Sequence, residues 1–468
     1  MHYISTRGTA PRLDFVDATL AGLARDGGLY VPESWPVMSA EEIRALAGLG
    51  YAEAAFRVTR PFVGDAIPEG AHREIVERTY AAFDHAAVAP LKELAPNLWL
   101  LELFHGPTLA FKDYAMQLLG NVFEHVLSRR GRRATIVGAT SGDTGSAAIE
   151  ACRDRAAMDV FILFPQGRVS EVQRRQMTTV EAPNVHALAI EGTFDDCQAI
   201  LKALFNDMAF REEAALSGIN SINWARILGQ VVYYFVAAAA LGAPERTVAF
   251  SVPTGNFGNI YAGYVARAMG LPVSHLVLAT NANDILSRAL ATGVMRRGAV
   301  TPSLSPSMDI QVASNFERLL FDLLGRDGAR VAQRMADFQD TGELTLDDEA
   351  WDEARALFAG FRLDDEGTLA EIRATLEATG ELIDPHSAVA LAGARANRRE
   401  ASIPLVSIAT AHPAKFPEAV ERATGIVPAL PARMADLYAR EESYVVLPND
   451  AAAVKAHIRA GLKARGAA

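Results

Sequence analysis

The stretch ATIVGATSGDTG, residues 134–145, combines the short, mostly apolar run Ala134–Val137, a glycine-rich turn and the start of a helix from about Thr144. A buried strand, a tight turn and a helix in this order are typical of one unit of a parallel sheet. Backbone N–H groups of such a turn, together with the hydroxyls of Thr140, Ser141 and Thr144, can hold an anion. The spacing is not that of the dinucleotide fingerprint, so an ordinary strand-to-helix turn is an equally good interpretation of this stretch alone.

The same alternation of apolar runs and helical patterns extends from about residue 97, so we expect an α/β fold with parallel strands. Residues 1–95 look mostly helical, with helical spacing over Asp14–Arg25 and Glu41–Arg57. Residues 325–380 look charged and helical, with a loop near Asp364–Gly367. The predicted strands are Trp99–Leu103, Ala134–Val137, Val160–Phe164, Val185–Ile190, Thr247–Val252, Val273–Ala279, Pro404–Ile408 and, near the end, Tyr444–Leu447.

The composition argues against several classes of protein. The 468 residues carry a formal net charge of −11, which does not favour nucleic acid as a partner. The two cysteines, Cys152 and Cys197, do not suggest a disulfide framework. We see no signal peptide, and the apolar run Val231–Ala243 is too short to span a bilayer and instead predicts a buried helix. We therefore expect a cytoplasmic protein without membrane spans, and scattered His and Cys residues do not predict a metal site.

A lysine stands at the start of a predicted helix in HGPTLAFKD, residues 105–113. Gly106 and Pro107 break the chain, and apolar residues at helical spacing follow Lys112. The helix dipole disfavours a cation at that end. Lys112 is therefore either a solvated surface lysine or a lysine whose amine is kept neutral, as Schiff-base chemistry requires.

A second glycine turn, PTGNFGN at residues 253–259, also lies between a predicted strand and a helix, here Asn259–Met269. Gly255 and Gly258 permit positive φ and a close approach of the backbone to a ligand. One such turn is easily explained without a ligand. Two turns that follow parallel strands favour a phosphate ligand.

Two further motifs are candidates for ligand binding. SIATAHPAKF, residues 407–416, follows a strand at the sheet edge where ligands gather, and the hydroxyl of Thr410 could bond a ring nitrogen without adding charge. The alternative is a polar loop stiffened by Pro413. SINWAR, residues 221–226, contains Arg226, which could clamp a phosphate or carboxylate, or could be an exposed structural arginine.

Taken together, these motifs resemble the threonine synthase family, in the branch found in fungi and many bacteria. One departure is Asn259, where we expect an acid in relatives. The segments that carry the resemblance run almost end to end: Tyr3–Gly8, Asp26–Pro32, Phe104–Asp113, Thr140–Gly145, Gly255–Asn259 and Thr410–Phe416.

The resemblance implies a pyridoxal-phosphate enzyme of fold type II, with two parallel-sheet α/β domains of the tryptophan synthase β type and a mostly helical N-terminal extension. The expected division is 1–95 for the extension, 96–125 with 230–430 for the large cofactor-binding domain, 126–229 for a smaller mobile domain, and 431–468 for a C-terminal segment.

The resemblance also assigns roles to the motif residues. Lys112 would form the Schiff base, and Thr410 would face the pyridine nitrogen. The cofactor phosphate would be surrounded by Gly255, Asn256, Phe257, Gly258 and Asn259. The substrate carboxylate would be held by Thr140, Ser141, Gly142, Asp143 and Thr144. Ser221, Asn223 and Arg226 are weaker candidates for the substrate phosphate.

The implied reaction converts O-phospho-L-homoserine and water to L-threonine and phosphate, by γ-elimination and β-addition of water. One rival is an amino-acid dehydratase of the same fold type, because fold does not fix chemistry. Another is a silent relative that only binds a ligand or a partner, but here every motif position is filled. The oligomeric state, monomer or homodimer, is left open.

Overall fold

The computed structural model describes residues 1–466, and their contacts divide the chain into two compact units. The first, which we call the large unit, comprises Met1–Ala115 and Ser221–Pro428. The second, the small unit, comprises Met116–Asn220 and Ala429–Ala468, described as far as residue 466. No helix among the described residues is both long and apolar enough to cross a membrane.

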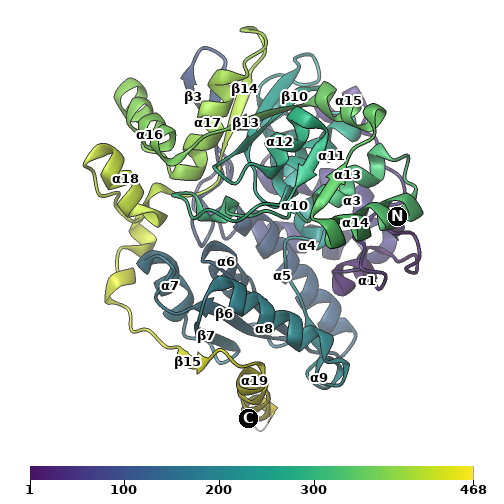
Figure 1. The fold of residues 1–468 in the computed structure, drawn as a ribbon, viewed down its shortest axis with the longest axis vertical. Helices are drawn as coiled ribbons and strands as arrows, with labels where there is room; N and C mark the ends of the chain where they lie inside the picture. Colours follow the sequence, from purple (N-terminus) through teal and green to yellow (C-terminus); the bar gives the residue numbers. More distant parts are fainter. Residues whose placement is uncertain (467–468) are drawn as a thin grey trace. The chain divides into compact units, whose positions relative to one another are not determined.

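The large unit is built on a six-stranded sheet (Figure 1). All neighbouring strands run parallel except the antiparallel pair β3–β4. β9 and β14 are buried along their whole length, as expected for strands covered on both faces. In spatial order the strands are β13 (Phe358–Arg362), β10 (Val273–Thr280), β9 (Val248–Pro253), β14 (Leu405–Ala409), β4 (Leu98–Glu102) and β3 (Leu91–Ala95).

Helices pack on this sheet, α17 and α11 both against β9 and β10. Helix α10 is buried almost all round, which confirms the buried helix predicted around Val231–Ala243. The helices around the sheet are α10 (Trp224–Ala240), α11 (Gly258–Ala268), α12 (Ile285–Thr292), α13 (Phe316–Leu323), α14 (Gly328–Thr341), α15 (Asp348–Leu357), α16 (Asp365–Thr379), α17 (Pro385–Ala396) and α18 (Pro417–Thr424).

The expectation that residues 325–380 are helical is only partly right. Strand β12 (Glu343–Thr345) pairs with β11 (Val294–Arg296), and β13 adds an edge strand to the main sheet. The predicted loop near Asp364–Gly367 is the start of α16, because Asp364 caps that helix by accepting from the N–H of Gly367.

The first 95 residues contain four short helices, and the expected run Glu41–Arg57 is broken. Helix α2 (Ala40–Arg44) ends before Gly48, whose φ is +79°, and α3 (Tyr51–Val63) begins after Gly50. The expected helix Asp14–Arg25 shortens to α1 (Phe15–Ala21), and α4 (Glu69–Tyr80) completes the set. Two unpredicted strands, β1 (Tyr3–Ser5) and β2 (Tyr30–Pro32), pair antiparallel.

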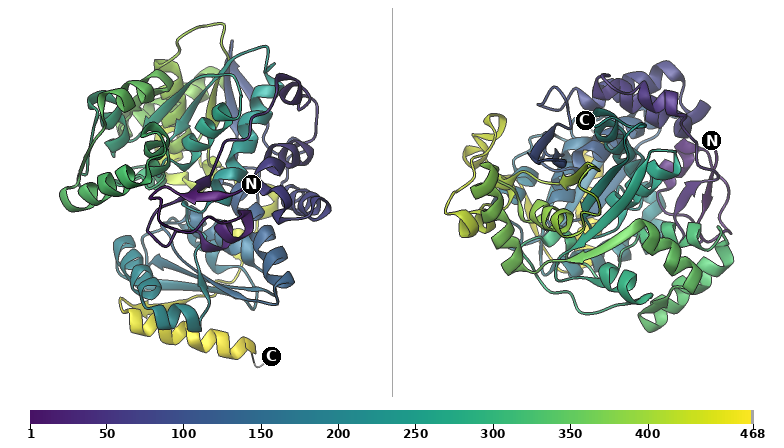
Figure 2. Two further views of the ribbon diagram at one scale, coloured as in Figure 1. Left: turned by 90° about the vertical axis from the view of Figure 1, so that its right-hand side faces the viewer. Right: turned by 90° about the horizontal axis from the view of Figure 1, so that it is seen from above.

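The small unit is built on a five-stranded, all-parallel sheet. Its spatial order is β15 (Val445–Pro448), β7 (Val185–Glu191), β6 (Met158–Pro165), β5 (Ala134–Ala139) and β8 (Leu216–Ser217). Helix α19 packs on α8, as the yellow and teal helices of Figure 2 show. The helices are α5 (Lys112–Arg129), which contains the boundary between the units, α6 (Asp143–Cys152), α7 (Glu171–Thr178), α8 (Phe194–Asn206), α9 (Met208–Glu213) and α19 (Ala451–Gly466).

The division into compact units differs from the expected domains at several boundaries: residues 116–125 group with the small unit, and residues 221–229 group with the large unit. Residues 1–95 group with the large sheet, because Tyr3 and Phe62 both pack on the ring of Trp224. The residues from 429 onward group with the small sheet, because β15 pairs with β7.

Candidate functional site

Asp113, the residue directly after Lys112, closes the turn that precedes this lysine. The Thr108 N–H and hydroxyl donate to the two carboxylate oxygens of Asp113, at 2.8 and 2.7 Å. A Cβ at Gly106 would lie 2.5 Å from the Asp113 Cβ, so only glycine fits there. Lys112 is the first residue of α5, in agreement with the predicted helix start, and its Nζ lies 4.9 Å from the centre of the Phe111 ring.

Backbone pairing joins this turn to the segment that contains Thr410. The Phe111 N–H donates to the Thr410 carbonyl at 2.8 Å, and the His412 N–H donates to the Leu109 carbonyl at 3.0 Å. Leu109 adopts a left-handed φ of +63°, a conformation that a non-glycine residue seldom takes. The structure therefore places Lys112 and Thr410 in directly paired segments, although these two residues are 298 positions apart in the sequence.

Lys415 also helps to fix the turn, although the sequence did not single it out for this role. Its side chain is fully buried, and its ammonium group donates to the Thr108 carbonyl at 2.7 Å. Nearby, burial lowers the pKa of His412 to about 4, so this ring is neutral at pH 7. A lysine between Ala414 and Phe416 is the one signal that could have suggested a buried cation.

The turn Gly255–Asn259 connects β9 to α11 and leaves the start of that helix open. Phe257 precedes the helix with a left-handed φ of +64°, and no side chain caps the helix. The first N–H groups of α11 are therefore available to an anion. A Cβ at Gly255 would lie 2.9 Å from the carbonyl oxygen of Ser307, so this glycine permits a close approach of two backbones.

Asn259 presents a buried donor at the same helix start. Its Oδ1 accepts from the hydroxyls of Tyr233 (2.6 Å) and Tyr234 (3.0 Å), and burial raises the pKa of both tyrosines, which keeps them protonated. The Asn259 Nδ2 has no hydrogen-bond partner among residues 1–466. A buried donor left unsatisfied costs about 1–3 kcal/mol, so an acceptor such as a phosphate oxygen would stabilise it.

In the Ser221–Arg226 segment, the side chain of Asn223 has a structural role, whereas that of Arg226 remains a candidate ligand for an anion. Asn223 is fully buried and structural: its Oδ1 caps α10 by accepting from Ala225 N–H at 3.0 Å, and its Nδ2 donates to Thr19 O at 2.8 Å. Arg226, in the first turn of α10, is only 4% exposed, so it is not the exposed arginine of the alternative interpretation. Burial lowers the pKa of Arg226 to about 10, which means that an anion beside it would favour the charged form.

In the small unit, the predicted Thr140–Thr144 turn lies between β5 and α6. The Thr140 hydroxyl accepts from the N–H groups of Gly142 and Gly145, each at 2.9 Å. Gly142 has a φ of +144°, and Gln173 donates to the Asp143 carboxylate at 2.9 Å. The turn therefore has a fixed shape, with the hydroxyl groups of its other residues, Ser141 and Thr144, on partly exposed side chains.

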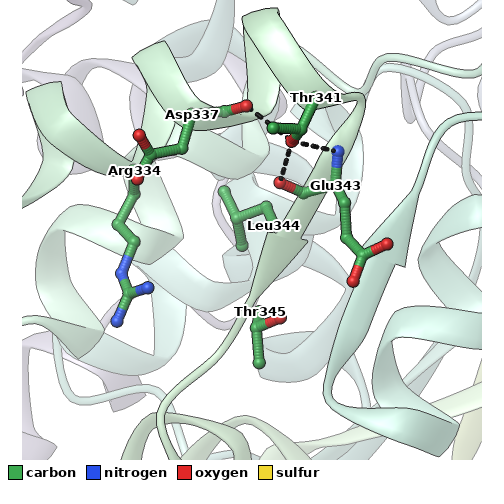
Figure 3. A pocket seen from close by; sticks show the side chains of 6 residues that line it. All are labelled: Arg334, Asp337, Thr341, Glu343, Leu344 and Thr345. Atoms are coloured by element: carbon green, nitrogen blue, oxygen red, sulfur yellow. Dashed lines mark hydrogen bonds between the residues drawn. The ribbon is translucent and has the colours of Figure 1, made fainter.

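A hollow of about 340 Å³ opens elsewhere on the large unit, beside α14 and β12 (Figure 3). Its polar groups bond one another: the Thr341 hydroxyl donates to the Asp337 carbonyl at 2.7 Å and accepts from the Glu343 N–H at 3.1 Å. No residue predicted for the site lines it, so it is not part of the candidate site. Its lining residues are Arg334, Asp337, Thr341, Glu343, Leu344 and Thr345.

Comparison with known families gives matches along most of the chain. The model "Threonine synthase N terminus" matches residues 2–80. "Pyridoxal-phosphate dependent enzyme" matches 84–410, and "Threonine synthase, C-terminal" matches 387–458.

Individual relatives and solved structures agree with these matches. Over 459 residues the chain is 58% identical to the threonine synthase of Pseudomonas aeruginosa, with 98% of each chain covered. It is similar to the crystal structure of pyridoxal-phosphate-bound threonine synthase from Brucella melitensis, with 54% identity, a TM-score of 0.97, and coverage of 98% of this chain and 99% of that one. For the crystal structure of threonine synthase from yeast, the identity is 38%, the TM-score 0.93 and the coverage 99% of both chains.

Proposed function

The chain belongs to the threonine synthase family, and from this premise we propose how its own residues convert O-phospho-L-homoserine and water to L-threonine and phosphate. The observation that carries the proposal is the backbone pairing between the Lys112 turn and the Thr410 segment. It brings one amine and one neutral hydroxyl to adjacent segments, as a pyridoxal-phosphate site needs. The buried Asn259 Nδ2 at an uncapped helix start fits the phosphate of that cofactor.

Pyridoxal phosphate, when bound, withdraws electrons from the α carbon of an amino acid and so makes the adjacent protons removable. In our proposal Lys112 holds the cofactor covalently through its amine. The same amine, once released by the substrate, would take the α proton, and it would assist removal of a β proton only after it has passed that first proton on; the γ carbon gains a proton once phosphate has left. Its place at the N-terminus of α5 disfavours the ammonium form, which keeps the amine able to accept a proton.

The cofactor ring would contact Thr410, which is 5% exposed. A hydroxyl can bond a ring nitrogen without bringing a negative charge, so it leaves that nitrogen unprotonated. His412 follows two residues later and is neutral at pH 7, which means that it brings no charge to the ring either. The loop Gly255, Asn256, Phe257, Gly258 and Asn259 would hold the cofactor phosphate through backbone N–H groups and the Asn259 amide.

Substrate binding would use two anion sites. Arg226 and Ser221 would bind the leaving phosphate, because a guanidinium keeps its charge and fits phosphate oxygens with a forked pair of donors. Asn223 supports them by starting α10. The substrate carboxylate would be held by the turn Thr140, Ser141, Gly142, Asp143 and Thr144, whose backbone at the start of α6 suits an anion.

The proposal is tested by trapping the covalent link and by assaying the leaving group. Borohydride reduction followed by peptide mapping should place the pyridoxyl mass on the peptide that contains Lys112. Phosphate release should occur with O-phospho-L-homoserine, whereas serine and threonine should be poor substrates. A pyridoxyl mass on Lys415 would contradict the assigned lysine, and efficient deamination of serine would favour the dehydratase alternative. We place the reaction in the cytoplasm, where the buried free thiols Cys152 and Cys197 stay reduced.

A further inference from the structure

One amide in the large unit connects two segments of the proposed site. Asn315, directly before α13, is fully buried. Its Nδ2 donates to the carbonyls of Asn256 (3.0 Å) and Ser221 (3.2 Å), and its backbone N–H also donates to the Asn256 carbonyl at 3.2 Å. Asn256 belongs to the loop proposed for the cofactor phosphate, and Ser221 to the segment proposed for the substrate phosphate. The Asn315 amide therefore fixes the distance between the two loops.

A buried arginine fixes the orientation of that amide. The Arg318 guanidinium donates to the Asn315 Oδ1, so the Nδ2 must face the two carbonyls. Arg318 also donates to Ile222 O at 2.5 Å and to Tyr30 O at 3.1 and 3.2 Å. The side chain is fully buried, and these backbone carbonyls replace the water that such a charge would otherwise bind.

The N-terminal segment is attached to the same turn of α13 by a second set of bonds. The carboxylate of Glu317 accepts from the Thr6 hydroxyl at 2.6 Å and from the Arg7 guanidinium at 3.1 and 3.0 Å. Together with the bonds from Arg318 to Tyr30 of β2, these contacts attach β2 and the residues that directly follow β1 to the start of α13.

We propose that Asn315 and Arg318 are positioning residues that set the Asn256 loop for binding the cofactor phosphate, with Tyr30 of the N-terminal segment as their anchor. The inference rests on the proposed function of that loop. Neither residue is a ligand. Arg318 fixes the amide, the amide holds the Asn256 carbonyl, and the N–H groups that follow in the loop then face the phosphate. The Ser221 segment is held by the same amide, so substrate affinity should change in the same direction.

The test is Asn315→Asp in the full chain. Aspartate keeps the size and the acceptor for Arg318, but it loses the two donors and places a carboxylate oxygen against two carbonyls. Asn184→Asp is the matched control, because Asn184 is equally buried and its Nδ2 donates to the carbonyls of Cys152 (2.7 Å) and Met158 (2.9 Å) in the small unit. Both variants are converted to apoprotein and titrated with pyridoxal phosphate, with cofactor fluorescence and apoprotein melting as readouts.

We expect Asn315→Asp to raise the Kd for pyridoxal phosphate at least tenfold and the KM for O-phospho-L-homoserine several-fold. Asn184→Asp should lower the melting temperature yet keep the parental Kd. If Asn315→Asp also keeps the parental Kd, the positioning role is refuted. If it does not fold, Arg318→Lys provides the second test: it keeps the charge but cannot hold the amide and both carbonyls together, so its Kd should rise several-fold. An unchanged Kd there refutes the proposal. A parent protein that fails to bind pyridoxal phosphate would instead refute the proposed function.

Discussion

Gly106→Ala should disable the turn that carries Lys112. The new Cβ would lie 2.5 Å from the Cβ of Asp113 and 2.6 Å from its Oδ2, closer than real side-chain atoms approach. Asp113 follows Lys112 directly in α5, so it can move only with the start of that helix. If Asp113 moves, its carboxylate loses the hydrogen bonds that it accepts from the Thr108 N–H and hydroxyl, at 2.8 and 2.7 Å.

The size of the effect follows from those two bonds. A hydrogen bond to a charged group is worth about 1.5–3 kcal/mol, so losing both would cost about 3–6 kcal/mol, an upper bound because the helix start can shift to keep one. Any such shift displaces Lys112. A misplacement of about 1 Å can cost about a hundredfold in rate. We therefore expect kcat/KM for O-phospho-L-homoserine to fall at least a hundredfold, with a destabilisation of about 2–4 kcal/mol.

Phosphate-release kinetics and urea denaturation measure the two quantities. Gly70→Ala is the matched control: Gly70 lies in α4 with no atom within 4 Å of the added Cβ. It should stabilise the protein by up to about 1 kcal/mol and leave kcat/KM unchanged. Retention of a third or more of the parental kcat/KM by Gly106→Ala would show that the turn does not hold the lysine in place.

Three further predictions concern single side chains. Arg226→Ala should lower kcat/KM for O-phospho-L-homoserine about tenfold to a hundredfold, because one charged hydrogen-bonding partner is lost, and the cofactor spectrum should be kept. Steady-state kinetics and an absorption scan test this. Loss of the cofactor without loss of phosphate selectivity would contradict it. Thr410→Asp should favour a protonated ring, so turnover should fall or pyridoxamine phosphate should accumulate, and parental behaviour would exclude a contact with the ring nitrogen. Burial lowers the pKa of His72 from 6.5 to about 4, so as the pH falls the unfolded chain protonates this ring before the folded chain does. The stability that neutral His72 provides is complete above pH 6.5 and is lost as the pH falls toward 4, by up to about 3 kcal/mol. The drop in free energy of unfolding between pH 7.5 and 4.5 should be smaller in His72→Gln, and equal drops would refute this.

Most strands of the two sheets were predictable because buried parallel strands are continuous apolar runs, but β3 and the two-residue β8 were not predicted. Each of the predicted strands is found within about two residues of its expected ends. The edge strand β13, in contrast, has the sequence FAGFR and alternating exposure in a charged region, so nothing separated it from its helical neighbours. The short strands β1 and β2 were missed for a related reason: three residues are too few to show a period.

From the sequence we could identify the candidate site residues that follow the strands. We could not identify the residues that hold those site residues in position. Lys112 and Thr410 follow strands of one parallel sheet, so their meeting could be inferred from topology. Asn315, Arg318 and Lys415 are polar residues that a sequence pattern assigns to the surface. Their burial depends on partners such as Tyr30, 288 positions away from Arg318, and no local signal reports such a partner.

The pairing of β15 with β7 has a consequence for how the chain matures on the ribosome. β7 is synthesised roughly 250 residues before β15, the strand that covers its free edge. At about 5–20 residues per second, that edge of the nascent small unit is exposed for on the order of 10–50 s. The large unit is also incomplete during this time, since its sheet receives β14 only after residue 405. Neither sheet can be completed before most of the chain has been translated, so open strand edges that could pair with another chain persist during synthesis.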